Sequence, residues 1–156
     1  MFTRTALSLA AVAAVAGLAT AALLAGKIEL KEFKFKGEVT DSQAGYNEGD
    51  NKLFYYAPAT AEAPVKIDAD GEFTITVEAS CDAALDENAK FTLKVGDVEV
   101  KKDFLLTATE AKEYTFTAKL KKGDPKLSIE FTNDTYKEGE YDRNLFVHAV
   151  KVEPKK

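Results

Sequence analysis

The side chains that could do the most chemistry in this chain gather in one acidic segment, residues 133–142. Four of them are carboxylates, and an asparagine and a glycine accompany them: Asn133, Asp134, Glu138, Gly139, Glu140 and Asp142. Carboxylate and carbonyl oxygens are the ligands that Ca²⁺ prefers, and the ion takes about six to eight of them. A calcium loop is therefore one interpretation, and a solvated acidic hairpin loop that binds no ion is the other.

The remaining reactive side chains are one histidine, His148, and one cysteine, Cys81. His148 lies in an apolar run, so we expect a packed strand residue with a hydrogen-bonded ring rather than a metal ligand or a base. Cys81 has no neighbouring cation or base in the sequence to lower its thiol pKa, so we expect an inert, half-buried thiol. The chain also lacks Gly-x-Ser-x-Gly, His-Glu-x-x-His and glycine-rich phosphate motifs. This scarcity predicts that the protein is not an enzyme.

Charge and cysteine content exclude further classes of protein. Residues 27–156 carry 20 Lys and Arg against 26 Asp and Glu. An acidic excess argues against nucleic-acid binding, which needs a basic footprint. A single cysteine excludes a disulfide framework, and the length of this part fits one domain.

The N-terminal residues 1–26 read as a membrane-targeting segment. Arg4 precedes an uncharged, apolar run over residues 5–26, for which we expect one apolar helix. Small residues around Ala19 and Ala21 suit a cleaved signal peptide, whereas the length also suits an uncleaved membrane anchor. Either interpretation puts residues 27–156 outside the cytoplasm: periplasmic, cell-surface or secreted, or anchored in the inner membrane. Contact with a membrane is expected only through residues 5–26, if they are retained.

Residues 27–156 must position the acidic segment, and their pattern predicts an all-β fold. Apolar and polar residues alternate, as in half-buried strands, over 73–79, 91–95, 114–118 and 127–131. Turn-forming residues separate these runs, and Gly96-Asp97 predicts a tight hairpin. Strands are also expected at 33–36, 98–101 and 144–152, the last buried on both faces, whereas residues 41–64 read as the longest irregular stretch. We therefore predict an antiparallel two-sheet β-sandwich, jelly-roll-like, with these residues buried: Phe73, Ile75, Val77, Leu93, Phe116, Ile129, Phe131, Phe146 and Val150.

A family resemblance is carried by the acidic segment and its flanks. The pattern F-T-N-D at 131–134, a short loop with a glycine, and D-R-N-L-F-V at 142–147 resembles the C-terminal signature of calcium-dependent, xylan-binding carbohydrate-binding modules. The runs DGEFTITV at 70–77 and KVGDVEV at 94–100 are similar to strands of the same family. The resemblance covers residues 68–152 and implies a β-sandwich in which a bound Ca²⁺ meets sugar hydroxyls directly.

The resemblance also implies roles for individual residues. Asp134 and Asp142 would be side-chain ligands of the ion, and Tyr141 would offer its main-chain carbonyl. Asn133 would be a ligand-binding residue. Arg143 and Asn144 also match the motif, and they are candidates for ligand binding or for holding the loop by hydrogen bonds. The chain has no tryptophan, so Tyr136 or Tyr141 would have to stack on sugar. Further calcium ligands would come from another loop, where Glu48 and Asp50 are the candidates.

Two functions are consistent with these observations. The first is an exported, non-catalytic binding module that recognises the hydroxyls of a xylan-like polysaccharide through Ca²⁺. The alternative is a membrane-anchored structural or accessory subunit whose β-sandwich docks on a protein complex. The mature N-terminus would separate them, because a chain starting near Ala22 or Gly26 indicates a soluble binder and an intact residue 1–26 segment indicates an anchored subunit.

Overall fold

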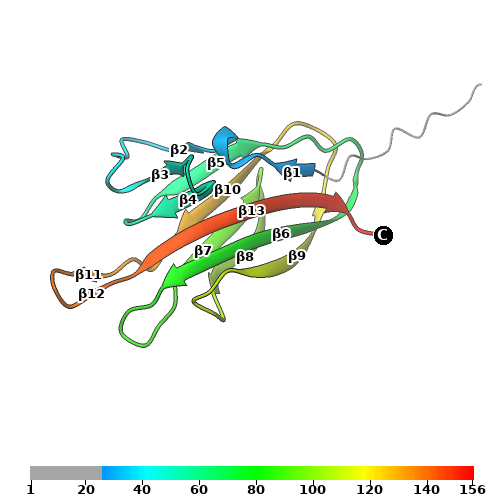
Figure 1. Cartoon of the computed structure of the whole chain (residues 1–156). Coiled ribbons are helices and arrows are strands. Elements are labelled where there is room, and N and C mark those ends of the chain that lie inside the picture. Colours follow the sequence, from blue (N-terminus) through cyan, green and yellow to red (C-terminus); the bar gives the residue numbers. More distant parts are fainter. Residues whose placement is uncertain (1–25) are drawn as a thin grey trace, which may run out of the picture.

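Alternating apolar side chains build the strands of two antiparallel sheets that pack face to face in the computed structural model (Figure 1). The structure describes residues 26–156. The expected N-terminal apolar helix, and with it the signal peptide or anchor, lies outside the described residues. Within residues 26–156, no helix is long and apolar enough to cross a membrane.

The first sheet has the strand order β3–β4–β13–β6–β9, and β1 pairs with β13 beyond the end of β4. Its strands are β1 (Gly26–Ile28), β3 (Ala44–Asn47), β4 (Lys52–Tyr55), β6 (Gly71–Asp82), β9 (Lys112–Leu120) and β13 (Asn144–Pro154). The long β13 pairs with β6 over most of its length. This sheet therefore has the chain's last strand near its centre.

The second sheet has the order β2–β5–β10–β7–β8. Its strands are β2 (Lys34–Phe35), β5 (Thr60–Pro64), β7 (Lys90–Val95), β8 (Val98–Leu105) and β10 (Lys126–Phe131). A small hairpin of β11 (Tyr136–Lys137) and β12 (Tyr141–Asp142) stands between β10 and β13, and a short 3-10 helix, η1 (Leu30–Glu32), precedes β2. The tight hairpin expected at Gly96-Asp97 is confirmed, because Val95 and Val98 pair across it.

The core lies between the inward faces of the two sheets. Most of the predicted core is confirmed as buried, namely Phe73, Ile75, Val77, Leu93, Ile129, Phe131 and Val150. One buried tyrosine links the sheets, since the hydroxyl of Tyr55 on β4 donates to the carbonyl of Ile129 on β10 at 3.3 Å. Burial raises the pKa of Tyr55 far above its usual value, so this hydroxyl keeps its proton.

Two predicted core positions are wrong. Phe116 and Phe146 are only half-buried, because the first packs near the edge between β8 and β9 and the second points away from the core. The expectation that the last strand is buried on both faces is also wrong, because one face of β13 points away from the core. Leu145 and Val147 face the core, whereas Phe146 and His148 lie on the outward face of the first sheet.

The irregular stretch predicted over residues 41–64 is also wrong, since it contains the whole of β3, β4 and β5. These strands have only four or five residues each, and the glycines and prolines around them obscured their alternation. The first expected strand, 33–36, is shorter than predicted: Phe33 is the C-cap residue of η1, and only Lys34–Phe35 form β2.

Candidate functional site

The acidic segment folds as a hairpin at one end of the sandwich (Figure 1). Tyr136 pairs with Asp142, and Lys137 pairs with Tyr141. Gly139 turns the chain with a φ of 73°, a conformation that favours glycine. The Lys137 ammonium and the Glu140 carboxylate form an ion pair of 2.6 Å beside the turn. Asp134 and Asp142 thus stand at the two ends of one short, ordered loop.

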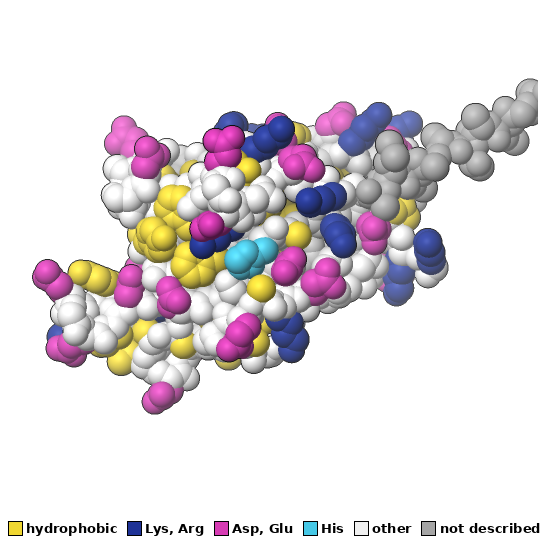
Figure 2. Space-filling model, in the orientation of Figure 1, with side chains coloured by type: hydrophobic (Ala, Val, Ile, Leu, Met, Phe, Trp, Pro, Cys, Tyr) yellow, Lys and Arg dark blue, Asp and Glu magenta, His cyan; other side chains and the backbone are white. Residues whose placement is uncertain are grey.

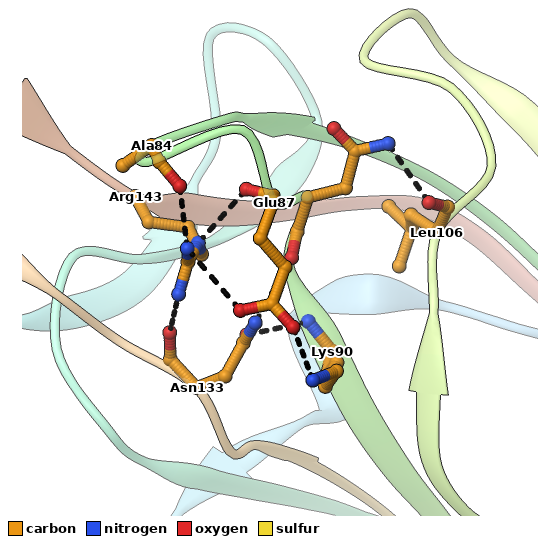
Figure 3. A network of polar contacts seen from close by, with 7 residues as sticks. Ala84, Glu87, Lys90, Leu106, Asn133 and Arg143 are labelled. Carbon is orange, nitrogen blue, oxygen red and sulfur yellow. Dashed lines mark hydrogen bonds and ion pairs between the residues drawn. The ribbon is translucent and has the colours of Figure 1, made fainter.

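A buried arginine fastens this loop to the rest of the molecule (Figure 3). Arg143 donates from Nη1 to the Asn133 carbonyl at 2.6 Å, from Nη2 to the Ala84 carbonyl at 2.5 Å, and from Nε to the Glu87 carbonyl at 3.0 Å. The carboxylate of Glu87 lies 3.4 Å from the same guanidinium. These internal partners take up donors on all three guanidinium nitrogens, which favours holding the loop over contacting a ligand.

Asn133 makes the matching connection from the other side. Its Oδ1 accepts from the Lys90 main-chain N–H at 2.6 Å, and its Nδ2 donates to the Asn88 carbonyl at 2.9 Å. The side chain therefore ties the start of the acidic loop to the start of β7. Asn133, like Arg143, is a positioning residue in this structure.

Asn144 orients the carboxylate of Asp142. Its Nδ2 donates to Asp142 at 3.1 Å and to Asp82 at 3.0 Å, and its side chain is buried. Asp82 is a functional candidate that sequence analysis missed. It lies at the end of β6, directly across from Asn144 in the sheet, and only the pairing of β6 with β13 shows this.

The Asp134 carboxylate has one oxygen atom that lacks a bonding partner. Its Oδ1 is buried and has no hydrogen-bond partner. Burial, and secondarily the negative charge of Asp142, raise the pKa of the Asp134 carboxyl. A buried carboxylate oxygen without a partner is costly, and a hard cation between the two aspartates would satisfy it and neutralise their repulsion.

The residues present fit a Ca²⁺ ion, with a partial set of side-chain ligands. Among the described residues, no three His, Cys, Asp or Glu side chains gather closely enough to hold a metal by themselves. Asp134 and Asp142 would therefore need main-chain oxygens and water to complete the shell, and the Tyr141 carbonyl adjoins Asp142 in β12. Glu48 and Asp50 lie in the turn between β3 and β4, where Asp50 pairs with Lys52 at 3.1 Å.

A shallow hollow of about 390 Å³ opens beside Asp142, and its lining is Ser42, Tyr56, Tyr136 and Asp142. Tyr136 is 64% exposed and Tyr56 is 45% exposed. Two tyrosine rings thus flank the Asp142 carboxylate, which is more exposed than that of Asp134. Sequence analysis named Tyr136 and missed Tyr56, whose place beside Asp142 depends on the pairing of β4 with β13.

His148 has the structural role that was expected, and Cys81 is more deeply buried than the half-buried thiol that was expected. His148 is half-buried, and its Nε2 shares a hydrogen bond of 2.7 Å with Ser80 Oγ. Burial lowers the pKa of His148, which keeps the imidazole neutral. Cys81 is buried, burial raises the pKa of its thiol, and the S–H points to the Ala108 carbonyl at 3.7 Å.

Comparison with known proteins places this geometry in context. A family model described as "Ca-dependent carbohydrate-binding module xylan-binding" (CBM60) matches residues 74–156. No curated protein sequence matches the chain.

Solved structures with the same fold include three carbohydrate-binding modules. The mannan-binding module from Man5C is 18% identical, with a TM-score of 0.59, over 84% of this chain and 99% of that one. A CBM36 module in complex with calcium and xylotriose is 17% identical, with a TM-score of 0.57, over 82% and 99% of the two chains. The CBM35 from Paenibacillus barcinonensis is 14% identical, with a TM-score of 0.56, over 83% and 99%. At these identities the likeness establishes the β-sandwich fold.

Proposed function

We propose that this chain is a non-catalytic module that binds xylan-like polysaccharide through Ca²⁺. The chain belongs to the Ca-dependent, xylan-binding carbohydrate-binding module family CBM60. The observation that carries this proposal is the buried, unpartnered Oδ1 of Asp134. This oxygen belongs to the same loop as Asp142, whose charge contributes to raising the Asp134 pKa. A bound cation would therefore give this oxygen a partner and would reduce the repulsion between the two carboxylates.

Asp134, Asp142 and the main-chain carbonyl of Tyr141 are the residues that would hold the ion. When bound, Ca²⁺ supplies coordination positions that sugar hydroxyls can fill directly. Asn144 holds the Asp142 carboxylate through its Nδ2, and Asp82 accepts a second bond from that amide. Arg143 and Asn133 hold the two ends of the loop. These hydrogen bonds therefore hold the two carboxylates, Asp134 and Asp142, in place.

Tyr136 and Tyr56 complete the site by flanking Asp142. A sugar ring offers hydroxyls at its edge and C–H groups on its faces. Aromatic rings beside the metal would pack against those faces while the ion takes the hydroxyls. The absence of tryptophan from the chain leaves this packing to tyrosine.

We infer that the module acts outside the cytoplasm and without catalysis of its own. The uncharged run over residues 5–26 supports export, as a cleaved signal or as a retained anchor. Mass spectrometry of the mature chain tests this. A new N-terminus near Ala22 or Gly26 supports a released module, and an intact Met1 supports an anchored one.

Binding to insoluble xylan, with calcium and with a chelator, tests the proposed function. We expect the protein to be retained on xylan in calcium and released by the chelator. Asp142→Asn should lose retention, whereas Asp97→Asn, at an exposed turn in the opposite sheet, should keep it. Tyr136→Ala should weaken binding about tenfold and leave the fold intact, because its exposed ring makes no core contact. Retention that is unchanged by the chelator would contradict the proposal, and mannan in a parallel assay would show the preference between polysaccharides.

A further inference from the structure

The outward face of the first sheet carries a group of aromatic residues next to the acidic loop, residues 133–142, which we call the metal loop. Along β13, Phe146 and His148 lie on the outward face, because Leu145 and Val147 are buried inward. Asn144 shares that face by alternation, although its side chain is buried. Strand pairing places Asp82 beside Asn144, and both Phe54 and Ser80 beside Phe146. The metal-loop residues and the sheet face thus form one continuous surface.

Three rings on this surface, Phe54, Tyr56 and Phe146, form what we call the aromatic strip. The Tyr56 ring lies 4.9 Å from Phe54 at 35° and 6.1 Å from Phe146 at 78°, between centroids. Lys52 Nζ lies 5.0 Å from the centre of the Phe146 ring. Tyr56 also lines the hollow beside Asp142, so the strip and the metal site share this residue.

The core does not explain why these rings face outward. The inward positions on the same strands are already filled by Leu53, Tyr55, Leu145 and Val147, all fully buried. Figure 2 shows hydrophobic side chains gathered on this face beside the histidine. Apolar side chains that gather on a surface mark binding sites more often than chance.

A glycine on the neighbouring strand makes room for the strip. Gly45 on β3 pairs with Phe54, and a Cβ at Gly45 would stand 2.9 Å from the tip of the Phe54 ring. Because atoms do not approach so closely, only glycine lets the ring extend over β3 as it does. The ring therefore spreads along the sheet surface, where it widens the strip.

Polar groups border the strip as they would border a sugar chain. Ser80 on β6 and His148 on β13 share a hydrogen bond of 2.7 Å next to the strip. The Lys52 ammonium, from β4, lies over the Phe146 ring. Donors and acceptors next to flat apolar rings suit a ligand with hydroxyl edges and C–H faces. A purely apolar partner would exclude water from these polar groups and offer them no further hydrogen bond.

We propose that the aromatic strip continues the sugar site, so that one polysaccharide chain bound at the metal loop runs over Tyr56 and Phe146 toward His148. The occupant is the same chain, because Tyr56 belongs to both parts of the surface. From Asn144 to His148 the strand rises about 13 Å at ~3.3 Å per residue, which makes room for more than one further sugar. This inference rests on the proposed function and adds that the module recognises an internal stretch of polysaccharide.

Calorimetric titration with xylobiose and with xylohexaose, both in saturating calcium, tests the strip. We expect the wild type to bind xylohexaose on the order of tenfold more tightly than xylobiose. Phe146→Leu keeps the apolar contact with the sheet but removes the flat ring. This variant should bind xylohexaose no more tightly than xylobiose, and its affinity for xylobiose should equal that of the wild type. The matched control is Phe104→Leu, a half-buried ring on the opposite sheet, which should behave as wild type.

The single histidine provides a second readout that needs no substitution. His148 lies at the far end of the strip and is the only histidine in the chain, so its ring signals in an NMR spectrum of the untagged protein are unambiguous. Xylohexaose should shift them, and xylobiose should leave them in place.

The outcomes separate this inference from the proposed function. Calcium-dependent binding of both sugars with equal affinity and an unmoved His148 signal would overturn the strip and leave the calcium site standing. No binding of either sugar in calcium would overturn both proposals.

Discussion

The guanidinium of Arg143 donates to the main-chain carbonyl of Asn133 at 2.6 Å, and this contact joins the two ends of the acidic loop. The main-chain N–H of Arg143 also donates to the Thr135 carbonyl at 2.9 Å. Asp134 and Asp142 are therefore held on one closed loop before any ion binds. Preorganisation of this kind reduces the ordering cost that binding would otherwise carry.

Replacing this arginine should destabilise the whole domain. Arg143→Met removes the donors to three main-chain carbonyls, of which the Ala84 carbonyl is buried and the other two are partly buried. We therefore expect a loss of about 3 kcal/mol in the free energy of unfolding. Urea denaturation in the absence of calcium measures it. The control is Lys137→Met, whose ion pair with Glu140 is more than half exposed. That variant should change stability by less than about 0.5 kcal/mol, and an equal loss in both would refute the positioning role.

Calcium should stabilise the native protein, because the unfolded chain has no loop to bind it. At a hundredfold excess over Kd, the gain should be about 2.7 kcal/mol. Differential scanning calorimetry should show a higher Tm in calcium, no such shift in Asp142→Ala, and a smaller one in magnesium, which demands tighter octahedral geometry. An unshifted wild-type Tm would return the loop to an ordinary acidic hairpin.

Without calcium, Asp134 should make the protein more stable at acidic pH. Its raised pKa means that the native state binds this proton more tightly than the unfolded chain does. Stability therefore rises as pH falls from neutral through the pKa of Asp134, and the gain ends near the ordinary pKa of aspartate.

Asp134→Asn isolates this effect. In a chelator at neutral pH, the variant should melt at a higher temperature than the wild type, and the difference should shrink as the pH falls. Calcium should no longer raise its Tm. A variant less stable than the wild type at neutral pH would show that the carboxylate is already satisfied without an ion.

The turn that receives Arg143 contains a strained residue. Leu85 has a φ of 55° and is 64% exposed, in the two-residue turn between Ala84 and Glu87. Asparagine tolerates this left-handed conformation better, so Leu85→Asn should stabilise the protein by about 1 kcal/mol in urea denaturation. The same change at Leu105, exposed but within strand β8, should give no gain.

The core position Ile129 should not accept a charge. Its side chain is fully buried between β5 and β7, so Ile129→Asp should cost more than about 4 kcal/mol and prevent folding. Circular dichroism should show loss of sheet. Its exposed neighbour supplies the control, since Glu130→Lys should stay within about 0.5 kcal/mol of the wild type.

The sequence by itself predicted what depends on neighbours along the chain. Strands such as 73–79 and 127–131 follow from alternation, which is a local property. The Gly96 hairpin follows from turn chemistry, and the presence of Asp134 and Asp142 in one loop follows from their short separation in the chain. The short strands within residues 41–64 were missed because four alternating residues between glycines and prolines carry too weak a signal.

Only the tertiary structure decided which distant residues join that loop. Asp82 reaches the site because β6 pairs with β13 in one register, and Tyr56 reaches it because β4 pairs with the other edge of β13. A shift of one residue in either pairing would turn these side chains to the opposite face. Register between distant strands is set by contacts across the whole core, such as the hydrogen bond from Tyr55 to the Ile129 carbonyl. The local pattern of one strand does not contain this information.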